Sequence, residues 1–168
     1  MRNLIKTFIL MLMLSFSHAA IAGDFEDGVI ASDKGDLATA VRLWISSAEQ
    51  GNVSAQSKLG VMYSFGQGVA QDYKTAVKWS TLSAEQGNAT GQLNVAICFL
   101  NGEGTGIDTI EALRYANLAS DQNLPAALNH LAWLYANGRC VEKNLTESFN
   151  YYMKSAQLGD ADGQREVA

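Results

Sequence analysis

The sequence predicts an all-α fold, an α-solenoid of stacked antiparallel helix pairs. The segment AEQGN occurs at 48–52 and again at 84–88, which places its two copies 36 residues apart. Comparison of 48–83 with 84–119 gives 11 identities in 36 positions, and residue types recur at the same phase in 120–155. Recurrence at a fixed period predicts a repeat architecture, in which each helix pair buries its apolar surface only by stacking on its neighbours.

Residues 1–22 have the three-part pattern of a secretory signal peptide. Arg2 and Lys6 precede an apolar run over 8–16, and the small residues Ala20 and Ala22 then match a signal-peptidase site. The alternative is a membrane anchor, but the run is short for a hydrocarbon core of about 30 Å. We expect cleavage before Gly23, no stable membrane insertion afterwards, and a periplasmic or secreted protein.

The remaining chain, 23–168, divides by the repeat into a partial unit at 24–47, full units at 48–83, 84–119 and 120–155, and a terminal helix at 156–168. Apolar residues make up 48% of the sequence and charged residues 17%, a composition typical of a folded protein. The recurring positions are large and apolar or aromatic: Leu59, Val95 and Leu131; Tyr63, Phe99 and Tyr135; Trp79, Tyr115 and Tyr151.

Each unit contains the signals of two helices. Apolar or small residues at helical spacing predict a first helix over 53–65, and Gly66 is placed to end it in a left-handed conformation. Asp72 is the predicted N-cap of a second helix over about 72–86. The pairs Asp108-x-x-Glu111 and Asn144-x-x-Glu147 match capping boxes. Gly60 lies inside the first helix, which indicates close approach of two helices.

These positions resemble the Sel1-like repeat family, which is related to the tetratricopeptide repeat. The resemblance covers about 24–168 and rests on the following residues: Leu59-Gly60, Tyr63, Gly66-x-Gly68-Val69, Asp72, Ala76, Trp79 and AEQG at 84–87. It implies an α-solenoid that binds a protein or peptide partner as a scaffold or adaptor. A regulator of an envelope sensor or of a polysaccharide export machine is an alternative that the family also offers.

The family includes cysteine-rich members that bind or hydrolyse β-lactams, and this chain departs from them. It contains only Cys98 and Cys140, and it has no Ser-x-x-Lys motif. A β-lactam-hydrolysing enzyme is therefore the weakest alternative. If the chain is exported, the two cysteines are either bridged to each other or free, and the sequence leaves both alternatives open.

Candidate residues for chemistry are few. His130 is the single histidine after residue 22, and it shows no ligand spacing with Cys98 or Cys140. The glycine-rich loops follow helices rather than strands, unlike phosphate-binding loops. Removal of Arg2 and Lys6 leaves 10 basic against 17 acidic residues, which argues against nucleic acid as a partner. We expect no enzyme activity, no metal and no cofactor.

Binding is the remaining function. In tetratricopeptide-like stacks the first helices line the concave face, and this phase places the apolar row Val61, Ile97 and Trp133 there with polar neighbours. The predicted partner-binding residues are Val61, Phe65, Leu93, Ile97, Leu100, Asn129, Trp133 and Asn137. An extended peptide or a partner helix would fit such a groove, with Trp133 as its anchor. The alternative is that these residues only pack the first helices together. We expect a monomer.

Overall fold

The computed structural model describes residues 23–168, and the predicted signal peptide lies outside them. Residues 23–33 are helical. The helices that follow are α2 (Leu37–Glu49), α3 (Val53–Phe65), α4 (Tyr73–Glu85), α5 (Ala89–Asn101), α6 (Thr109–Asp121), α7 (Pro125–Asn137), α8 (Leu145–Gln157) and α9 (Ala161–Glu166). This part of the chain contains no strand. The predicted all-α fold is confirmed, and α3 has the predicted bounds.

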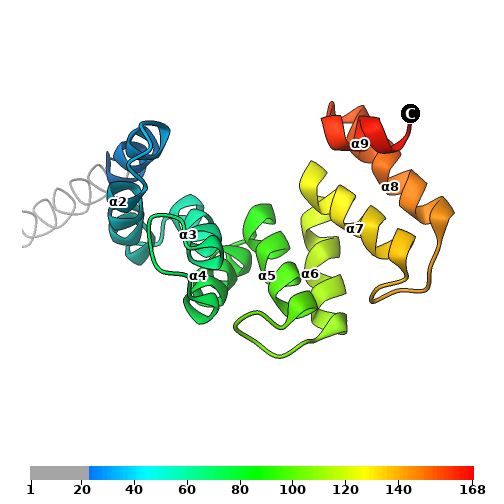
Figure 1. Ribbon diagram of the computed structural model, residues 1–168, viewed down its shortest axis with the longest axis horizontal. Helices are drawn as coiled ribbons and strands as arrows, with labels where there is room; N and C mark the ends of the chain where they lie inside the picture. The colour runs from blue at the N-terminus through cyan, green and yellow to red at the C-terminus, as the bar shows by residue number, and fades with distance from the viewer. Residues whose placement is uncertain (1–22) are drawn as a thin grey trace, which may run out of the picture.

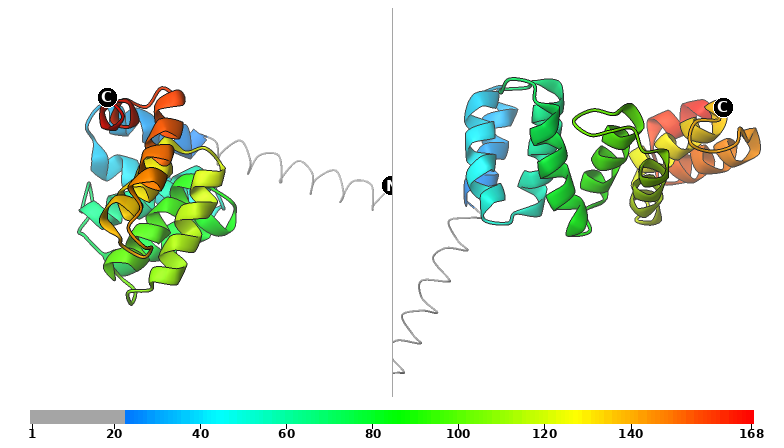
Figure 2. Two further views of the ribbon diagram at one scale, coloured as in Figure 1. Left: turned by 90° about the vertical axis from the view of Figure 1, so that its right-hand side faces the viewer. Right: turned by 90° about the horizontal axis from the view of Figure 1, so that it is seen from below.

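The helices form a row of stacked pairs (Figure 1). Each first helix, α3, α5 or α7, packs against the second helix that follows it, α4, α6 or α8. Figure 2 shows that the pairs change direction along the stack, as in a superhelix. The first helices also contact one another, α3 with α5 and α5 with α7, whereas α4, α6 and α8 have no equally extensive contacts among themselves. The stack therefore curves with the first helices on its inner, concave side.

The helix ends follow the predicted signals. Gly66 ends α3 with φ 65°, a left-handed conformation that glycine adopts without a Cβ clash. The Asp72 side chain accepts hydrogen bonds from the backbone N–H groups of Lys74 and Thr75 at the start of α4. The backbone N–H of Asp72 donates to the carbonyl oxygen of Tyr63 at 3.0 Å, which folds the connecting loop back onto α3.

The predicted capping boxes form only in half. The Asp108 side chain accepts from the N–H groups of Ile110 and Glu111, as expected. The Glu111 side chain does not complete the box, because the N–H of Asp108 already donates to the carbonyl oxygen of Phe99. Glu111 instead pairs with Arg114 at 2.6 Å.

Each AEQGN segment connects the second helix of one unit to the first helix of the next, α2 to α3 and α4 to α5. Asn88 caps α5 by accepting from the N–H of Gly91. Gln86 donates its side-chain amide to the side-chain oxygen of Gln56 at 2.8 Å. The side-chain amide of Gln56 in turn donates to the carbonyl oxygen of Ala48, the first residue of the preceding AEQGN segment. Gln122 and Gln92 repeat the first of these bonds one unit later. The glutamine therefore links α4 to α3 and α6 to α5, whereas the C-cap residue of α8 is Leu158, which has no side-chain amide.

The core lies between the helices of the stack. Its fully buried large side chains are Trp44, Leu59, Val95, Leu128, Leu131 and Leu134. The predicted close approach at Gly60 is confirmed, because a Cβ there would overlap the hydroxyl oxygen of Ser80 on α4. Small residues thus let paired helices come together, and the large residues fill the spaces between pairs.

Candidate partner-binding groove

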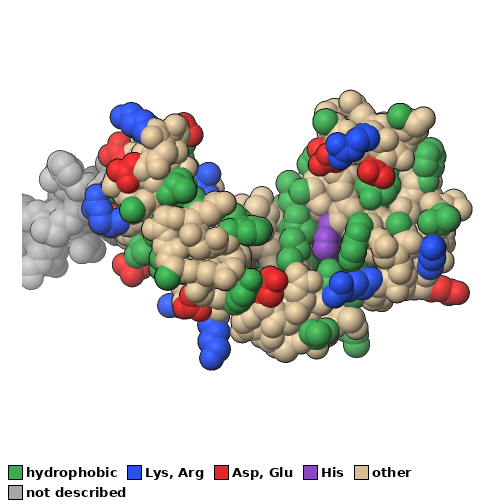
Figure 3. All heavy atoms as spheres, viewed as in Figure 1, with side chains coloured by type: hydrophobic (Ala, Val, Ile, Leu, Met, Phe, Trp, Pro, Cys, Tyr) green, Lys and Arg blue, Asp and Glu red, His purple; other side chains and the backbone are tan. Residues whose placement is uncertain are grey.

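The apolar row of the sequence analysis lies on the concave side. Val61 on α3 and Ile97 on α5 are half-buried, and Trp133 on α7 is 41% exposed. Figure 3 shows the molecule hollowed between the half that contains α2–α4 and the half that contains α7–α9, with hydrophobic side chains gathered on its wall. Each first helix therefore contributes one apolar side chain that reaches the surface at the same repeat position.

The other predicted residues divide between surface and core. Phe65 is 70% exposed, and Asn137 is exposed and donates its amide to the carbonyl oxygen of Trp133. Leu93 and Leu100 are only 7% and 4% exposed. Leu93 packs with Ala119 and Ala127. These two leucines belong to the core rather than to a binding surface, because both α6 of the same unit and α7 of the next unit pack against that side of α5.

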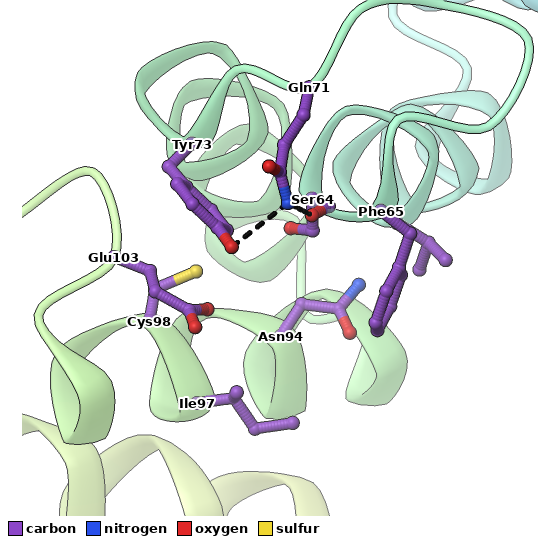
Figure 4. Close-up of a pocket in the computed structure, with 9 residues that line it drawn as sticks. Ser64, Phe65, Gln71, Tyr73, Asn94, Ile97, Cys98 and Glu103 are labelled. Atoms are coloured by element: carbon purple, nitrogen blue, oxygen red, sulfur yellow. Dashed lines mark hydrogen bonds between the residues drawn. The ribbon is translucent and has the colours of Figure 1, made fainter.

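A hollow of about 120 Å³ opens between α3 and α5, beside Val61 and Ile97. Figure 4 shows side chains from both helices and from the two intra-unit loops around it. Its lining residues are Val61, Ser64, Phe65, Gln71, Tyr73, Asn94, Ile97, Cys98 and Glu103. A hydrogen-bond chain closes one side, where Gln71 donates its amide to the carbonyl oxygen of Ser64 at 2.8 Å and to the hydroxyl of Tyr73 at 2.9 Å.

Asn94 and Glu103 are residues of this hollow that the sequence did not single out. The side-chain nitrogen of Asn94 is buried and has no hydrogen-bond partner in the part of the chain that the structure describes. Within residues 23–168, the Glu103 carboxylate accepts one side-chain hydrogen bond, at 3.5 Å from the amide of Asn101. The repeat gives a weak signal for both, since their counterparts one unit earlier are Lys58 and Gln67, so neither position keeps a residue type.

At α7 the groove presents Trp133, which lies beside His130 and Arg139. Trp133 stacks on His130 with ring centroids 6.5 Å apart, and the guanidinium of Arg139 lies 5.9 Å from the centre of the Trp133 ring. Trp133 also borders a second hollow of about 400 Å³ together with Leu145, Phe149 and Tyr152. Asn129 is half-buried and donates its side-chain amide to Asp160, the N-cap of α9, at 2.8 Å. Hydrogen bonding with Asn129 is the main cause of the lowered pKa of Asp160.

The cysteines and the histidine of the described chain lie in partly or fully buried positions. Cys98 and Cys140 are both free thiols, Cys98 buried and Cys140 half-buried. Burial, reinforced by the nearby charge of Glu103, raises the pKa of Cys98 to about 11, so this thiol is protonated at neutral pH. Burial lowers the pKa of His130. Within residues 23–168, no three His, Cys, Asp or Glu side chains lie together as they would to hold a metal ion.

Over residues 23–168, each helix is too short or too polar to cross a lipid bilayer.

Solved structures with the same fold come from bacterial repeat proteins. One is a protective antigen present in uropathogenic Escherichia coli strains that displays an SLR fold, with 32% identity, a TM-score of 0.78, and coverage of 90% of this chain and 33% of that chain. Another is a Sel1 repeat protein from Oxalobacter formigenes, with 26% identity, a TM-score of 0.75, and coverage of 86% and 57%. This chain thus spans about a third of the first protein and a little over half of the second. Comparison with curated proteins gives no match.

The repeat itself matches a family model over most of the chain. The Sel1 repeat is matched at 25–52, 53–88, 89–124 and 125–160. The three complete matches to the family model have the predicted period of 36 residues. Each match begins at the first residue of α3, α5 or α7, five residues after the unit boundary that the AEQGN repeat suggests. Helix pairs, period and structural neighbours agree, and the chain belongs to the Sel1 repeat family.

Proposed function

We propose that this chain is an exported scaffold that binds a segment of a partner protein along the concave groove of the first helices. Sel1 repeat proteins are generally non-enzymatic scaffolds for protein–protein interaction. The observation that supports the groove is the row formed by Val61, Ile97 and Trp133, which exposes one apolar side chain per unit on the concave side. Export is supported by the signal-peptide pattern of residues 1–22.

The geometry of the row suits an extended peptide or a helix better than a small molecule. The apolar positions belong to three different units, and the hollows beside them are separate. A ligand that contacts all three positions must therefore be long, and the rigid stack pre-organises the surface that it meets. Trp133 is the expected anchor, because large aromatic side chains dominate the energetics of interfaces.

Site-specific photocrosslinking tests the groove. A photoreactive phenylalanine analogue replaces Val61, Ile97 or Trp133 in turn, and the matched control carries it at Leu118, a 39% exposed position on the second helix α6. We expect one partner species to be crosslinked from all three groove positions and not from Leu118. Equal crosslinking from Leu118, or a different species from each groove position, would contradict the proposal.

Export has its own test. Fractionation of the natural host, followed by mass spectrometry of the N-terminus, should give a mature chain that begins near Gly23 outside the cytoplasm. A full-length chain retained in the cytoplasm would contradict export and leave the groove to be judged by crosslinking.

A further inference from the structure

The hollow between α3 and α5 combines an apolar wall with a single charged group. Val61 and Ile97 supply the wall, and the Phe65 ring stands at its edge with 70% of its surface exposed. Figure 4 shows the Glu103 carboxylate facing into the same space, below the hydroxyl of Tyr73. Such a wall matches the methylene groups of a long side chain, and such a carboxylate matches a cation at its tip.

Within residues 23–168, Glu103 forms no ion pair. No lysine or arginine is among the residues that line the hollow. Across the described residues 23–168, the ion pairs involve only Arg114 with Glu111, and Arg165 with Asp162 and Glu166. Lys58, the basic residue of α3, is engaged elsewhere, with its ammonium 5.0 Å from the centre of the Trp44 ring. The half-buried carboxylate of Glu103 therefore offers an open position for a positive charge.

Asn94 offers a second open position in the same hollow. Its side-chain nitrogen is buried and donates to no acceptor in the described chain. A buried donor without a partner is destabilising, and a ligand that supplies an acceptor removes this cost. Figure 4 shows the Asn94 amide directed toward the Phe65 ring. A backbone carbonyl of an extended peptide is an acceptor that would lie there when a side chain enters the hollow.

We propose that this hollow is the specificity pocket of the groove and that it binds an arginine or lysine side chain of an extended partner segment. This inference rests on the function proposed above. The cation pairs with Glu103, the aliphatic stem packs on Val61 and Ile97, and a backbone carbonyl of the segment accepts from Asn94.

Size and overall charge are consistent with this occupant. A cavity of about 120 Å³ is several times the ~30 Å³ that one water occupies in the liquid, and it is below the roughly 300–1,000 Å³ of small-molecule pockets. The pocket therefore has room for one side chain rather than for a cofactor. The net charge of −5 attracts a basic segment before contact is made.

A peptide series on the full chain tests the pocket. The probes are four blocked pentapeptides, acetyl-Ala-Ala-Xaa-Ala-Ala-amide, in which Xaa is arginine, lysine, norleucine or glutamate. Binding is followed by NMR through the side-chain amide signals of Asn94. We expect the arginine and lysine peptides to bind about three- to tenfold more tightly than the norleucine peptide, the scale of a partly buried ion pair. The glutamate peptide should bind most weakly.

Two charge-removing variants separate the pocket from general attraction. Glu103→Gln should reduce the preference for arginine over norleucine to less than about twofold, because it keeps the shape and removes the charge. Glu85→Gln removes the same charge at an exposed position at the end of α4, outside the hollow, and should keep the preference.

Equal affinities for the arginine and norleucine peptides, a preference that survives Glu103→Gln, or no shift of the Asn94 signals with any peptide would each overturn the inference. Crosslinking from Val61, Ile97 and Trp133 would still support the proposed groove in each of these cases.

Discussion

At the scale of single residues, the contact between Gly60 and Ser80 sets how closely α3 and α4 pack. A Cβ at residue 60 would overlap the Ser80 hydroxyl, and this hydroxyl is buried without a partner. One unit later the same two positions hold Ala96 and Ala116, both fully buried. Glycine at residue 60 therefore makes room for the serine oxygen, whereas the next unit has one methyl group on each helix.

Replacing both residues should recreate the pair of the next unit. Gly60→Ala alone should lower the free energy of unfolding by ~1–3 kcal/mol through overpacking, less the gain of about 1 kcal/mol in helix propensity. The double variant with Ser80→Ala should be at least as stable as the unmodified chain. Urea unfolding of the four proteins of this double-mutant cycle measures the coupling. Additive effects would show that the two side chains do not compete for the same space.

His130 should make stability depend on pH near neutrality. Burial lowers its pKa below 6.5, so the unfolded chain binds a proton at pH values where the folded chain does not. The free energy of unfolding should therefore fall as the pH drops below about 6.5, until the folded-state pKa is reached. The pKa of Asp160 is lowered by its hydrogen bonds, so the stability that this carboxylate contributes is lost only as the pH falls below about 3.8. His130→Gln should flatten the curve between pH 7.5 and 5.5, and an unchanged slope in urea titrations would contradict this assignment.

At the scale of the helices, the N-caps carry more stability than the carboxylates that follow them. Asp108 satisfies two N–H groups of α6, whereas Glu111 forms an exposed pair with Arg114. We expect Asp108→Ala to cost ~0.5–2 kcal/mol of unfolding free energy. Glu111→Gln should cost distinctly less, because its ion pair with Arg114 is exposed to solvent. Thermal unfolding of both variants tests whether the Glu111 side chain takes part in the cap. In a complete capping box, the two substitutions would lower the stability by similar amounts.

The helices were predictable because their signals are local. The period, the glycine at residue 66 and the cap at Asp72 lie within one unit, and they place both ends of α3 and the start of α4. The absence of the reciprocal bond to Glu111 was not predictable from one unit, since the Asp108 N–H that would donate it already donates to the carbonyl oxygen of Phe99. This contact forms only when the loop folds back.

At the scale of the whole molecule, the candidate site depends on contacts between units. The periodicity identifies Val61, Ile97 and Trp133 as one row, but it does not show that Leu93 is covered by the next helix pair. The hollow with Asn94 and Glu103 also needs α3 and α5 side by side, with the loops of two units closing over it. Surface features that arise between repeats are therefore the part of the site that a single unit cannot specify.

Because each unit packs mainly against its neighbours, a core substitution should destabilise the helices near it more than distant ones. Leu131 is fully buried and packs with Ala96, Ala112 and Leu134, so Leu131→Ala should cost ~2–5 kcal/mol. Because each unit contacts only its neighbours, hydrogen exchange should accelerate in α6–α8 more than in α2 and α3. Leu118→Ala, at a 39% exposed site on α6, is the matched control and should change exchange little. An equal loss of protection in α2 and α7 would show instead that the whole stack unfolds as one unit, as in a globular domain with a single core.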